Sequence, residues 1–295
     1  MPTRRRLEEM HVEVQQIVVA ALSSRGIEID SESLRLLDQF LDPEMVVVPN
    51  GLDLDPNDVI AARTKEIKNL EDFDAYEWVP VAQAQGKKWI KSRWEDLEKF
   101  DPRKAPVRSR WVLQEIATYK SDDIFSATPS PTSTRIVDMI AVDNGWPTVD
   151  GDVTTAFMHA DEPDEVYTDA PDGWRRPGWC WRLKKNINGR RTGAKNWFGF
   201  ATDCLVELKL IPTKADPCTF VDLEKQVYIV VHVDDFHGTG PLENLKVVME
   251  AISKKMLMKW EDPVWPGQAG GFLQRDRHRT EEGLVVVPNQ KLITD

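Results

Sequence analysis

The sequence has few cysteines and no long apolar run, and its net charge is negative. It has three cysteines among 295 residues, an odd number without a CxxC pair, which argues against a disulfide framework or a zinc ribbon. No apolar run approaches the ~18 residues that a membrane helix requires. The longest run near the start, residues 17–22, is too short for a secretory signal. We therefore expect an intracellular protein, cytoplasmic or nuclear.

The net charge of −11 argues at first against a nucleic-acid partner, because phosphate binding requires lysine and arginine. The charge is segregated, however, and residues 174–198 carry eight basic residues and no acid. The same stretch holds four tryptophans, and basic and aromatic residues together are typical of surfaces that bind single strands. The basic residues are Arg175, Arg176, Arg182, Lys184, Lys185, Arg190, Arg191 and Lys195.

Apolar periodicity and capping residues predict several helices and strands. Helices are expected from Ser31, from Asp55 and Pro56 to about Phe73, from Thr132 or Ser133 to Gly145, after Thr192, and after Pro241. Strands are expected over 45–48, 147–153, 227–233, 236–239 and 284–287. Strands and helices alternate without a strict βαβ rhythm, so the pattern predicts an α+β fold with helices behind an antiparallel sheet.

Three aspartates follow strand-like segments. Asp234 and Asp235 lie at the tip of a predicted hairpin after a dense β-branched run, and Asp152 ends another strand. Adjacent carboxylates repel each other unless a cation neutralises them. A polar turn is the common interpretation of an isolated Asp-Asp pair. With a third carboxylate on a neighbouring strand, two divalent ions could hold a triphosphate and activate a hydroxyl.

The segment around Asp152 resembles a known polymerase motif. Residues 152–157 read Asp-Val-Thr-Thr-Ala-Phe, similar to the first motif of copia-type reverse transcriptases, Asp-Val-x-Thr-Ala-Phe. Residues 180–185 resemble that family's basic block, residues 215–221 its Ala-Asp-Pro-Cys block, and residues 233–235 its Val-Asp-Asp box. The likeness runs from about residue 61 to the end in the family's order.

The resemblance implies the fingers and palm of a right-hand polymerase, an α+β fold whose antiparallel palm sheet is backed by helices. It implies a helical appendage of unknown role over residues 1–55, fingers and palm over 56–270, and a primer-grip region or start of a truncated thumb over 271–295. Most of the thumb and the ribonuclease H domain would be absent, as expected of a piece of a Pol polyprotein or a gene derived from one.

The resemblance also implies roles for the matched residues. Asp152, Asp234 and Asp235 would be the catalytic metal ligands for two Mg²⁺ ions. Phe157 would exclude the ribose 2′-hydroxyl, Arg108 and Arg110 would face the triphosphate, and Val153 and Val233 would border the nucleotide. The expected partners are an RNA or DNA template–primer and deoxynucleoside triphosphates. The residues expected to contact nucleic acid are Lys184, Lys185, Arg190, Arg191 and Lys195.

The sequence departs from the family pattern at two places. His232 replaces the tyrosine before Val-Asp-Asp, and Thr192-Gly193-Ala194 replaces Gln-Ala-Pro. A decayed or co-opted polymerase fold that binds nucleic acid or protein is therefore an alternative function. A His/Asp metallohydrolase built on His232 and His237 is a weaker alternative, because on one strand the two rings would face opposite sides.

Overall fold

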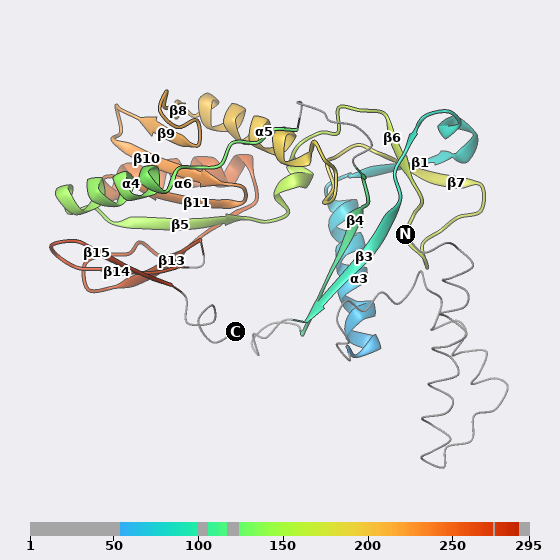
Figure 1. Cartoon of the computed structure of the whole chain (residues 1–295), viewed down its shortest axis with the longest axis horizontal. Helices are drawn as coiled ribbons and strands as arrows, with labels where there is room; N and C mark the ends of the chain where they lie inside the picture. The colour runs from blue at the N-terminus through green and yellow to red at the C-terminus, as the bar shows by residue number, and fades with distance from the viewer. Residues whose placement is uncertain (1–53, 99–105, 117–123, 274, 289–295) are drawn as a thin grey trace, which may run out of the picture. The chain divides into compact units, whose positions relative to one another are not determined.

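The computed structural model describes residues 54–98, 106–116, 124–273 and 275–288 (Figure 1). The predicted appendage over 1–55 lies almost entirely outside these residues, as do the helix expected from Ser31 and the strand expected over 45–48. The described residues form two compact units. The first contains those up to 116 together with 164–183, and the second contains 124–163 and those from 184 onward. Within the described part of the chain, no helix is long and apolar enough to cross a bilayer.

One helix of the first unit covers a strand pair. Helix α3 (Pro56–Asp72) begins after Asp55, whose carboxylate accepts a hydrogen bond from the backbone N–H of Asn57 at 2.7 Å. This cap, with Pro56 at the first helical position, confirms the predicted start. Strands β3 (Ser92–Glu98) and β4 (Val107–Leu113) pair antiparallel, and α3 packs against β4.

A four-stranded sheet completes the first unit, in the order β1, β7, β6, β2. These strands are β1 (Tyr76–Pro80), β7 (Trp179–Leu183), β6 (Val166–Thr168) and β2 (Lys88–Trp89), and the 3-10 helix η2 (Val81–Ala84) follows β1. The pairing of β2 with β6 is parallel, and the sequence pattern predicted neither of these two strands. Trp181 is wholly buried here, stacked on Tyr76 with ring centroids 3.7 Å apart.

The second unit is built on a six-stranded sheet in which every pairing is antiparallel, as predicted. Its order is β12 (Met258–Trp260), β5 (Thr148–Val153), β11 (Asp235–Thr239), β10 (Val227–His232), β9 (Thr219–Asp222) and β8 (Ile211–Pro212). The central strands are flanked by paired neighbours on both sides. Residues at the end of one central strand are therefore held beside residues of the next.

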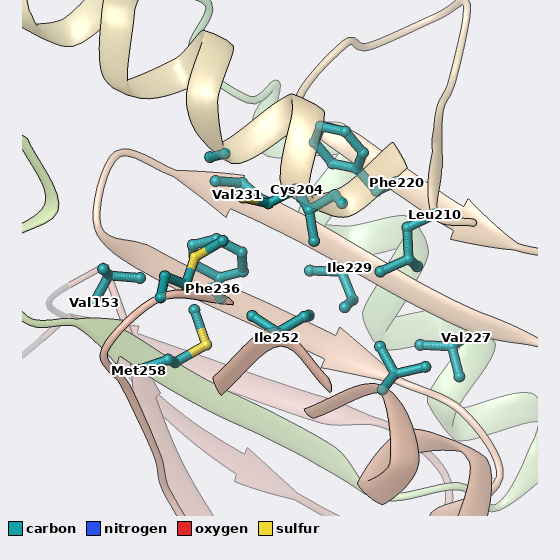
Figure 2. Packing of buried hydrophobic residues seen from close by; sticks show 14 of the residues in the cluster. Val153, Cys204, Leu210, Phe220, Val227, Ile229, Val231, Phe236, Ile252 and Met258 are labelled. Atoms are coloured by element: carbon teal, nitrogen blue, oxygen red, sulfur yellow. The ribbon is translucent and has the colours of Figure 1, made fainter. Parts of the chain in front are cut away.

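Strand alternation divides the six-stranded sheet into an apolar and a polar face. On the apolar face, Val153, Ile229 and Phe236 pack into one core with helices α5 (Gly193–Glu207) and α6 (Leu242–Lys255) (Figure 2). The opposite face carries polar residues of β5 and β11 and contacts helix α4 (Pro131–Asn144) and the three-stranded sheet β13–β15. That sheet comprises β13 (Ala269–Phe272), β14 (Arg275–Arg279) and β15 (Leu284–Pro288).

Helix boundaries were predicted closely, with two differences. Helix α4 is capped by Ser130 and begins at Pro131, one or two residues before the expected start, and it ends as predicted at Gly145, whose φ is +65°. Thr192 precedes α5 at the cap position, but its hydroxyl makes no capping hydrogen bond. Its backbone is already near-helical, with φ −84° and ψ −6°, whereas a capping residue is normally extended.

Buried Asp216 ties the strand β9 region to the start of α4. Its carboxylate accepts hydrogen bonds from the backbone N–H of Ser130 at 2.8 Å, from the backbone N–H of Cys218 at 2.9 Å and from the Ser133 hydroxyl. Burial alone would raise the pKa of Asp216, but these hydrogen bonds hold that pKa below its ordinary value. The Ala-Asp-Pro-Cys block thus has a structural explanation, since the aspartate joins two segments distant in sequence.

We expect Asp216→Ala to lower the free energy of unfolding by about 3 kcal/mol, because it leaves buried donors without an acceptor. The folded-state pKa is depressed, so this stabilisation is present at neutral pH and is lost as the pH falls below the ordinary pKa of aspartate. Urea unfolding at pH 7 and pH 3 measures both effects. Asp203→Ala, at an exposed site on α5, is the control. Equal losses for the two variants at pH 7 would contradict this role for Asp216.

Candidate active site

The turn between β10 and β11 presents two of the predicted aspartates. Strand β10 ends at His232 and β11 begins at Asp235, so Val233 and Asp234 form a two-residue turn. Val233 adopts φ +54°, a conformation that a β-branched residue rarely adopts and that costs on the order of 1–3 kcal/mol. The indole N–H of Trp197 donates to the Val233 carbonyl at 2.8 Å, so helix α5 holds the turn in place.

The register of β5 against β11 brings the third aspartate to the same place. Asp152 is the direct cross-strand partner of Asp235, and such partners project from the same face of a sheet. The backbone N–H of Val153 donates to the Asp234 carbonyl at 2.8 Å, which joins the end of β5 to the turn. The structure therefore gathers Asp152, Asp234 and Asp235 at one end of the sheet.

The electrostatics of this carboxylate cluster show an excess of negative charge. Burial, followed by the neighbouring charges of Asp234 and Asp152, raises the pKa of Asp235 to about 6. Asp152 is exposed and the other two carboxylates are half-buried, so the cluster is open to solvent. A proton or a cation would relieve the repulsion.

The donor set of the carboxylate cluster fits a hard divalent cation. Carboxylate oxygens are the ligands that Mg²⁺ prefers, and a cation would remove the repulsion that raises the pKa of Asp235. Among the described residues, however, no group of three or more His, Cys, Asp or Glu side chains lies close enough together to hold a metal ion. The cluster thus has the charge and atom types for Mg²⁺, but its three side chains do not converge on one ion as they stand.

Phe157 follows β5 by a short turn. Thr155 adopts a left-handed conformation with φ +53°, and the chain then enters the 3-10 helix η3 (Ala156–His159). Phe157 is half-buried against the core beneath the sheet and lies beside Gly193, where an added Cβ would be 3.9 Å from its ring. The predicted sugar-gating residue is therefore held between the end of β5 and the start of α5.

The basic residues of the second unit divide into surface and buried positions. Lys184 is exposed, and Lys185, Arg191 and Lys195 are half-buried. Lys185 also pairs with Asp161, at 2.6 Å. These four side chains are on the same unit as the carboxylate cluster.

Arg190, predicted to contact nucleic acid, is placed differently. Its guanidinium donates two hydrogen bonds to Glu162, at 2.7 and 2.6 Å, and both side chains are completely buried. A buried arginine with a bidentate carboxylate partner is structural, because exposing it would leave Glu162 as an uncompensated buried charge. We therefore remove Arg190 from the candidate nucleic-acid surface.

The tryptophans of the basic stretch also differ from the sequence expectation. Trp181 and Trp197 are almost fully buried in the cores of the two units, so they are not available to stack on bases. Trp179 is exposed at the start of β7, and Trp174 packs near Trp94. Two of the four tryptophans of this stretch are therefore core residues rather than part of a stacking surface.

Arg108 and Arg110 belong to the first unit, on strand β4. Ser109 between them points inward, so alternation places both arginines on the opposite face of the strand. Arg110 is the cross-strand partner of Glu95, and both arginines lower the pKa of Glu66 on α3, which burial raises. Their charges are thus partly balanced by nearby acids of the same unit.

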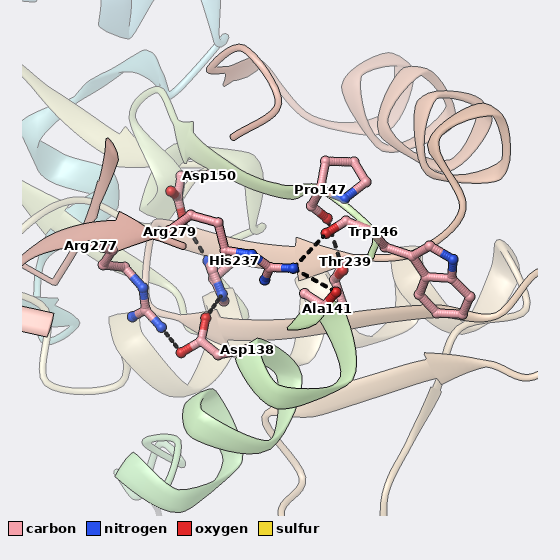
Figure 3. A network of polar contacts seen from close by, with 9 residues as sticks. All are labelled: Asp138, Ala141, Trp146, Pro147, Asp150, His237, Thr239, Arg277 and Arg279. Carbon is pink, nitrogen blue, oxygen red and sulfur yellow. Dashed lines mark hydrogen bonds and ion pairs between the residues drawn. The ribbon is translucent and has the colours of Figure 1, made fainter. Parts of the chain in front are cut away.

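Sequence reasoning missed a buried polar network around His237 (Figure 3). The ring nitrogens of His237 lie 2.6 Å from Asp150 and 3.0 Å from Asp138, and the ring is completely buried. The hairpin register places His232 and His237 on the same face of the sheet, so the expectation that they face opposite sides is wrong. Polar residues at every second position of β5 and β11 were the available signal: Thr148, Asp150 and Asp152, and Asp235, His237 and Thr239.

Curated relatives of the chain are Pol polyproteins of plant transposons. One from transposon RE2 of Arabidopsis thaliana is 32% identical over 168 residues, covering 55% of this chain and 11% of the relative. One from transposon TNT 1-94 of Nicotiana tabacum is 25% identical over 215 residues, covering 69% of this chain and 16% of the relative. The chain thus spans less than a fifth of their lengths, and these relatives confirm the resemblance to copia-type reverse transcriptases.

Solved structures give weaker likenesses. A telomerase from Candida albicans aligns with a TM-score of 0.45 at 8% identity, covering 76% of this chain and 49% of that chain. A foamy viral protease–reverse transcriptase aligns with a TM-score of 0.43 at 10% identity, covering 91% and 47%. At these scores neither structure contributes to the assignment.

The family assignment comes from the sequence profile of the family described as reverse transcriptase (RNA-dependent DNA polymerase). That profile matches residues 75–264, which include the carboxylate cluster, Phe157 and the basic residues of the second unit. Because the match covers more than half of the chain, the chain belongs to the reverse transcriptase (RNA-dependent DNA polymerase) family.

Proposed function

We propose that the chain is the catalytic fingers-and-palm portion of a retroelement reverse transcriptase that extends a primer with deoxynucleotides. The observation that carries this proposal is the cross-strand pairing of Asp152 with Asp235 beside the Asp234 turn. A family member retained only for binding would have no need to keep three mutually repelling carboxylates at one sheet end. Their repulsion costs stability, which is reasonable where a cation is used.

Asp152, Asp234 and Asp235 would hold two Mg²⁺ ions, which would neutralise phosphate charge and activate the primer 3′-hydroxyl. The contribution of the protein is to hold the carboxylates in position. Trp197 and the backbone of Val153 fix the turn, so the backbone that carries the carboxylates is already in place and their side chains would turn toward the ions.

The remaining residues select and hold the substrates. Phe157 would crowd a ribose 2′-hydroxyl and so favour deoxynucleotides, and Arg108 and Arg110 would bind the triphosphate. Val153 and Val233 would border the nucleotide through the backbone segments that they occupy. The template–primer would lie on a basic surface consisting of Lys184, Lys185, Arg191 and Lys195.

The decisive experiment is Mg²⁺-dependent primer extension by wild type and Asp152→Asn. We expect the variant to lose extension by about 1,000-fold or more, because the ions lose a charged ligand, whereas its affinity for template–primer stays within about twofold. Asp203→Asn, on the exposed face of α5, controls for removing an aspartate. Full extension by Asp152→Asn would contradict the proposal, and a wild type that binds template–primer but never extends it would favour the co-opted binding module.

The basic surface should determine the salt dependence of binding. We expect Lys184→Gln, Arg191→Gln and Lys195→Gln together to reduce the slope of log affinity against log salt by about 2–3, since each phosphate contact contributes roughly 0.7–0.9. Fluorescence anisotropy over a salt series measures the slope. Lys209→Gln, at an exposed site after α5, is the matched control and should leave it unchanged. An unaltered slope in the triple variant would place the nucleic acid elsewhere.

Asp235 should make the metal-free protein less stable at neutral pH than at pH 4. Its folded-state pKa is about 6 and its ordinary value is 3.8, so the folded state binds the proton more tightly and stability rises as the pH falls through this window. We expect Asp235→Asn to stabilise the protein at pH 7 in EDTA by on the order of 1 kcal/mol, a figure reduced for solvent screening, and to have little effect at pH 4.

Thermal unfolding of wild type and Asp235→Asn with and without Mg²⁺ completes this test. Mg²⁺ should stabilise wild type more than the variant, because a ligand stabilises the state to which it binds. An Asp235→Asn variant that is less stable than wild type at pH 7 in EDTA would show that the carboxylate cluster is not under charge repulsion.

A further inference from the structure

His237 is the centre of a four-residue polar network on the polar face of the six-stranded sheet (Figure 3). Its Nδ1 lies 2.6 Å from an Asp150 oxygen and its Nε2 lies 3.0 Å from an Asp138 oxygen. The second oxygen of Asp138 accepts a hydrogen bond from the Arg277 guanidinium. The network therefore joins four elements, because these residues lie on β11, β5, α4 and β14.

All four side chains of the His237 network are buried. The exposed fraction is 0% for His237, 4% for Asp138, 6% for Asp150 and 6% for Arg277. Burying ionisable groups carries a large desolvation cost that hydrogen bonding only partly offsets, and well-packed apolar residues often give equal or better stability. Stability alone is thus a poor explanation for this cluster, whereas directional hydrogen bonds do fix geometry.

The network is directly beside the carboxylate cluster. Asp150 and His237 are cross-strand partners, and the next pair on the same face, two residues along each strand, is Asp152 with Asp235. A slip of one residue between β5 and β11 would offset Asp152 from Asp235 and so separate these two carboxylates. The Asp150–His237 contact prevents such a slip, because it joins side chains across the same two strands.

A second sheet covers the network and shields it from water. An added Cβ at Gly270 on β13 would lie 3.3 Å from an Asp150 oxygen, so the β13 backbone lies directly against that carboxylate. The Phe272 ring lies 5.0 Å from the His237 ring, between their centroids. Hydrogen bonds in such a low-dielectric setting are stronger and more directional than they are in water.

We propose that His237 is a positioning residue for the carboxylate cluster, holding β5 and β11 in the register that places Asp152 opposite Asp235. Asp150 and Asp138 orient the ring from both sides, and Arg277 connects this arrangement to the three-stranded sheet. The inference rests on the proposed function, since it concerns the same metal-binding carboxylates. It predicts that changes in the network weaken metal binding without touching a metal ligand.

The test compares three variants with wild type. His237→Gln keeps a side-chain amide but cannot contact both carboxylates as the two ring nitrogens do. Asp138→Asn keeps the shape of the network but removes the charged group that contacts His237 and Arg277. Leu245→Ala is the control, because it opens a cavity in the apolar core on the other face of the sheet. Urea unfolding establishes the folded fraction of each protein, and all further measurements refer to that fraction.

Two measurements distinguish a role of His237 in positioning the carboxylate cluster from a role in stability alone. Electron paramagnetic resonance gives the affinity for Mn²⁺ without nucleic acid, and primer extension gives the Mg²⁺ concentration for half-maximal rate. We expect His237→Gln to weaken Mn²⁺ binding and to raise that Mg²⁺ concentration by about 10-fold, within the 10–100-fold range typical of residues that orient metal ligands. Asp138→Asn should change both in the same direction by less, and Leu245→Ala should change neither.

Each outcome bears on the proposal. If folded His237→Gln and Asp138→Asn bind Mn²⁺ within twofold of wild type, His237 is structural only and the inference is wrong. If His237→Gln does not fold, Asp138→Asn decides by the same criterion. If wild type binds Mn²⁺ through Asp152 but extends no primer, the proposed function fails, and Mn²⁺ affinity still decides the inference. If wild type binds no Mn²⁺ that Asp152→Asn abolishes, the inference is overturned.

Discussion

The pairing of β5 with β11 is the constraint on which the candidate site depends. It sets Asp152 opposite Asp235, while the backbone hydrogen bond from Val153 to Asp234 brings the turn to the same end of the sheet. A slip of one residue would separate the carboxylates, because successive side chains of a strand point to opposite faces. The apolar core under one face and the His237 network on the other both stabilise this register.

At the candidate site, a strained backbone and mutually repelling carboxylates are held in place by contacts from other parts of the chain. Val233 is in an unfavourable conformation and Asp235 is crowded by like charges, and both features cost free energy. The supporting contacts come from elsewhere in the chain: Trp197 on α5 holds the turn, and the core of α5 and α6 lies beneath it. The cation that we propose for this site would balance the charge repulsion, which the described contacts of the protein do not remove.

In the basic stretch, residues 174–198, only some of the charged and aromatic residues remain candidates for binding nucleic acid. Its excess of positive charge on an acidic chain is visible in the sequence, and four of the basic residues considered for nucleic-acid binding remain candidates. The fifth, Arg190, forms a buried ion pair with Glu162, and two tryptophans of the stretch are core residues. The number of charged or aromatic residues in a run therefore overestimates how many are available on the surface, because some of them pack in the core.

The three aspartates, the strands that carry them and the helix ends at Asp55 and Gly145 could be predicted from sequence, because they depend on short-range periodicity and capping. The burial of Arg190, the missing cap at Thr192 and the position of His237 between two carboxylates became visible only in the folded chain. The partners involved are far away in the chain: Asp138 is 99 residues from His237, and Glu162 is 28 from Arg190. Local patterns encode which residues alternate or cap, but which distant groups meet is fixed only when the sheet and its covering layers pack together.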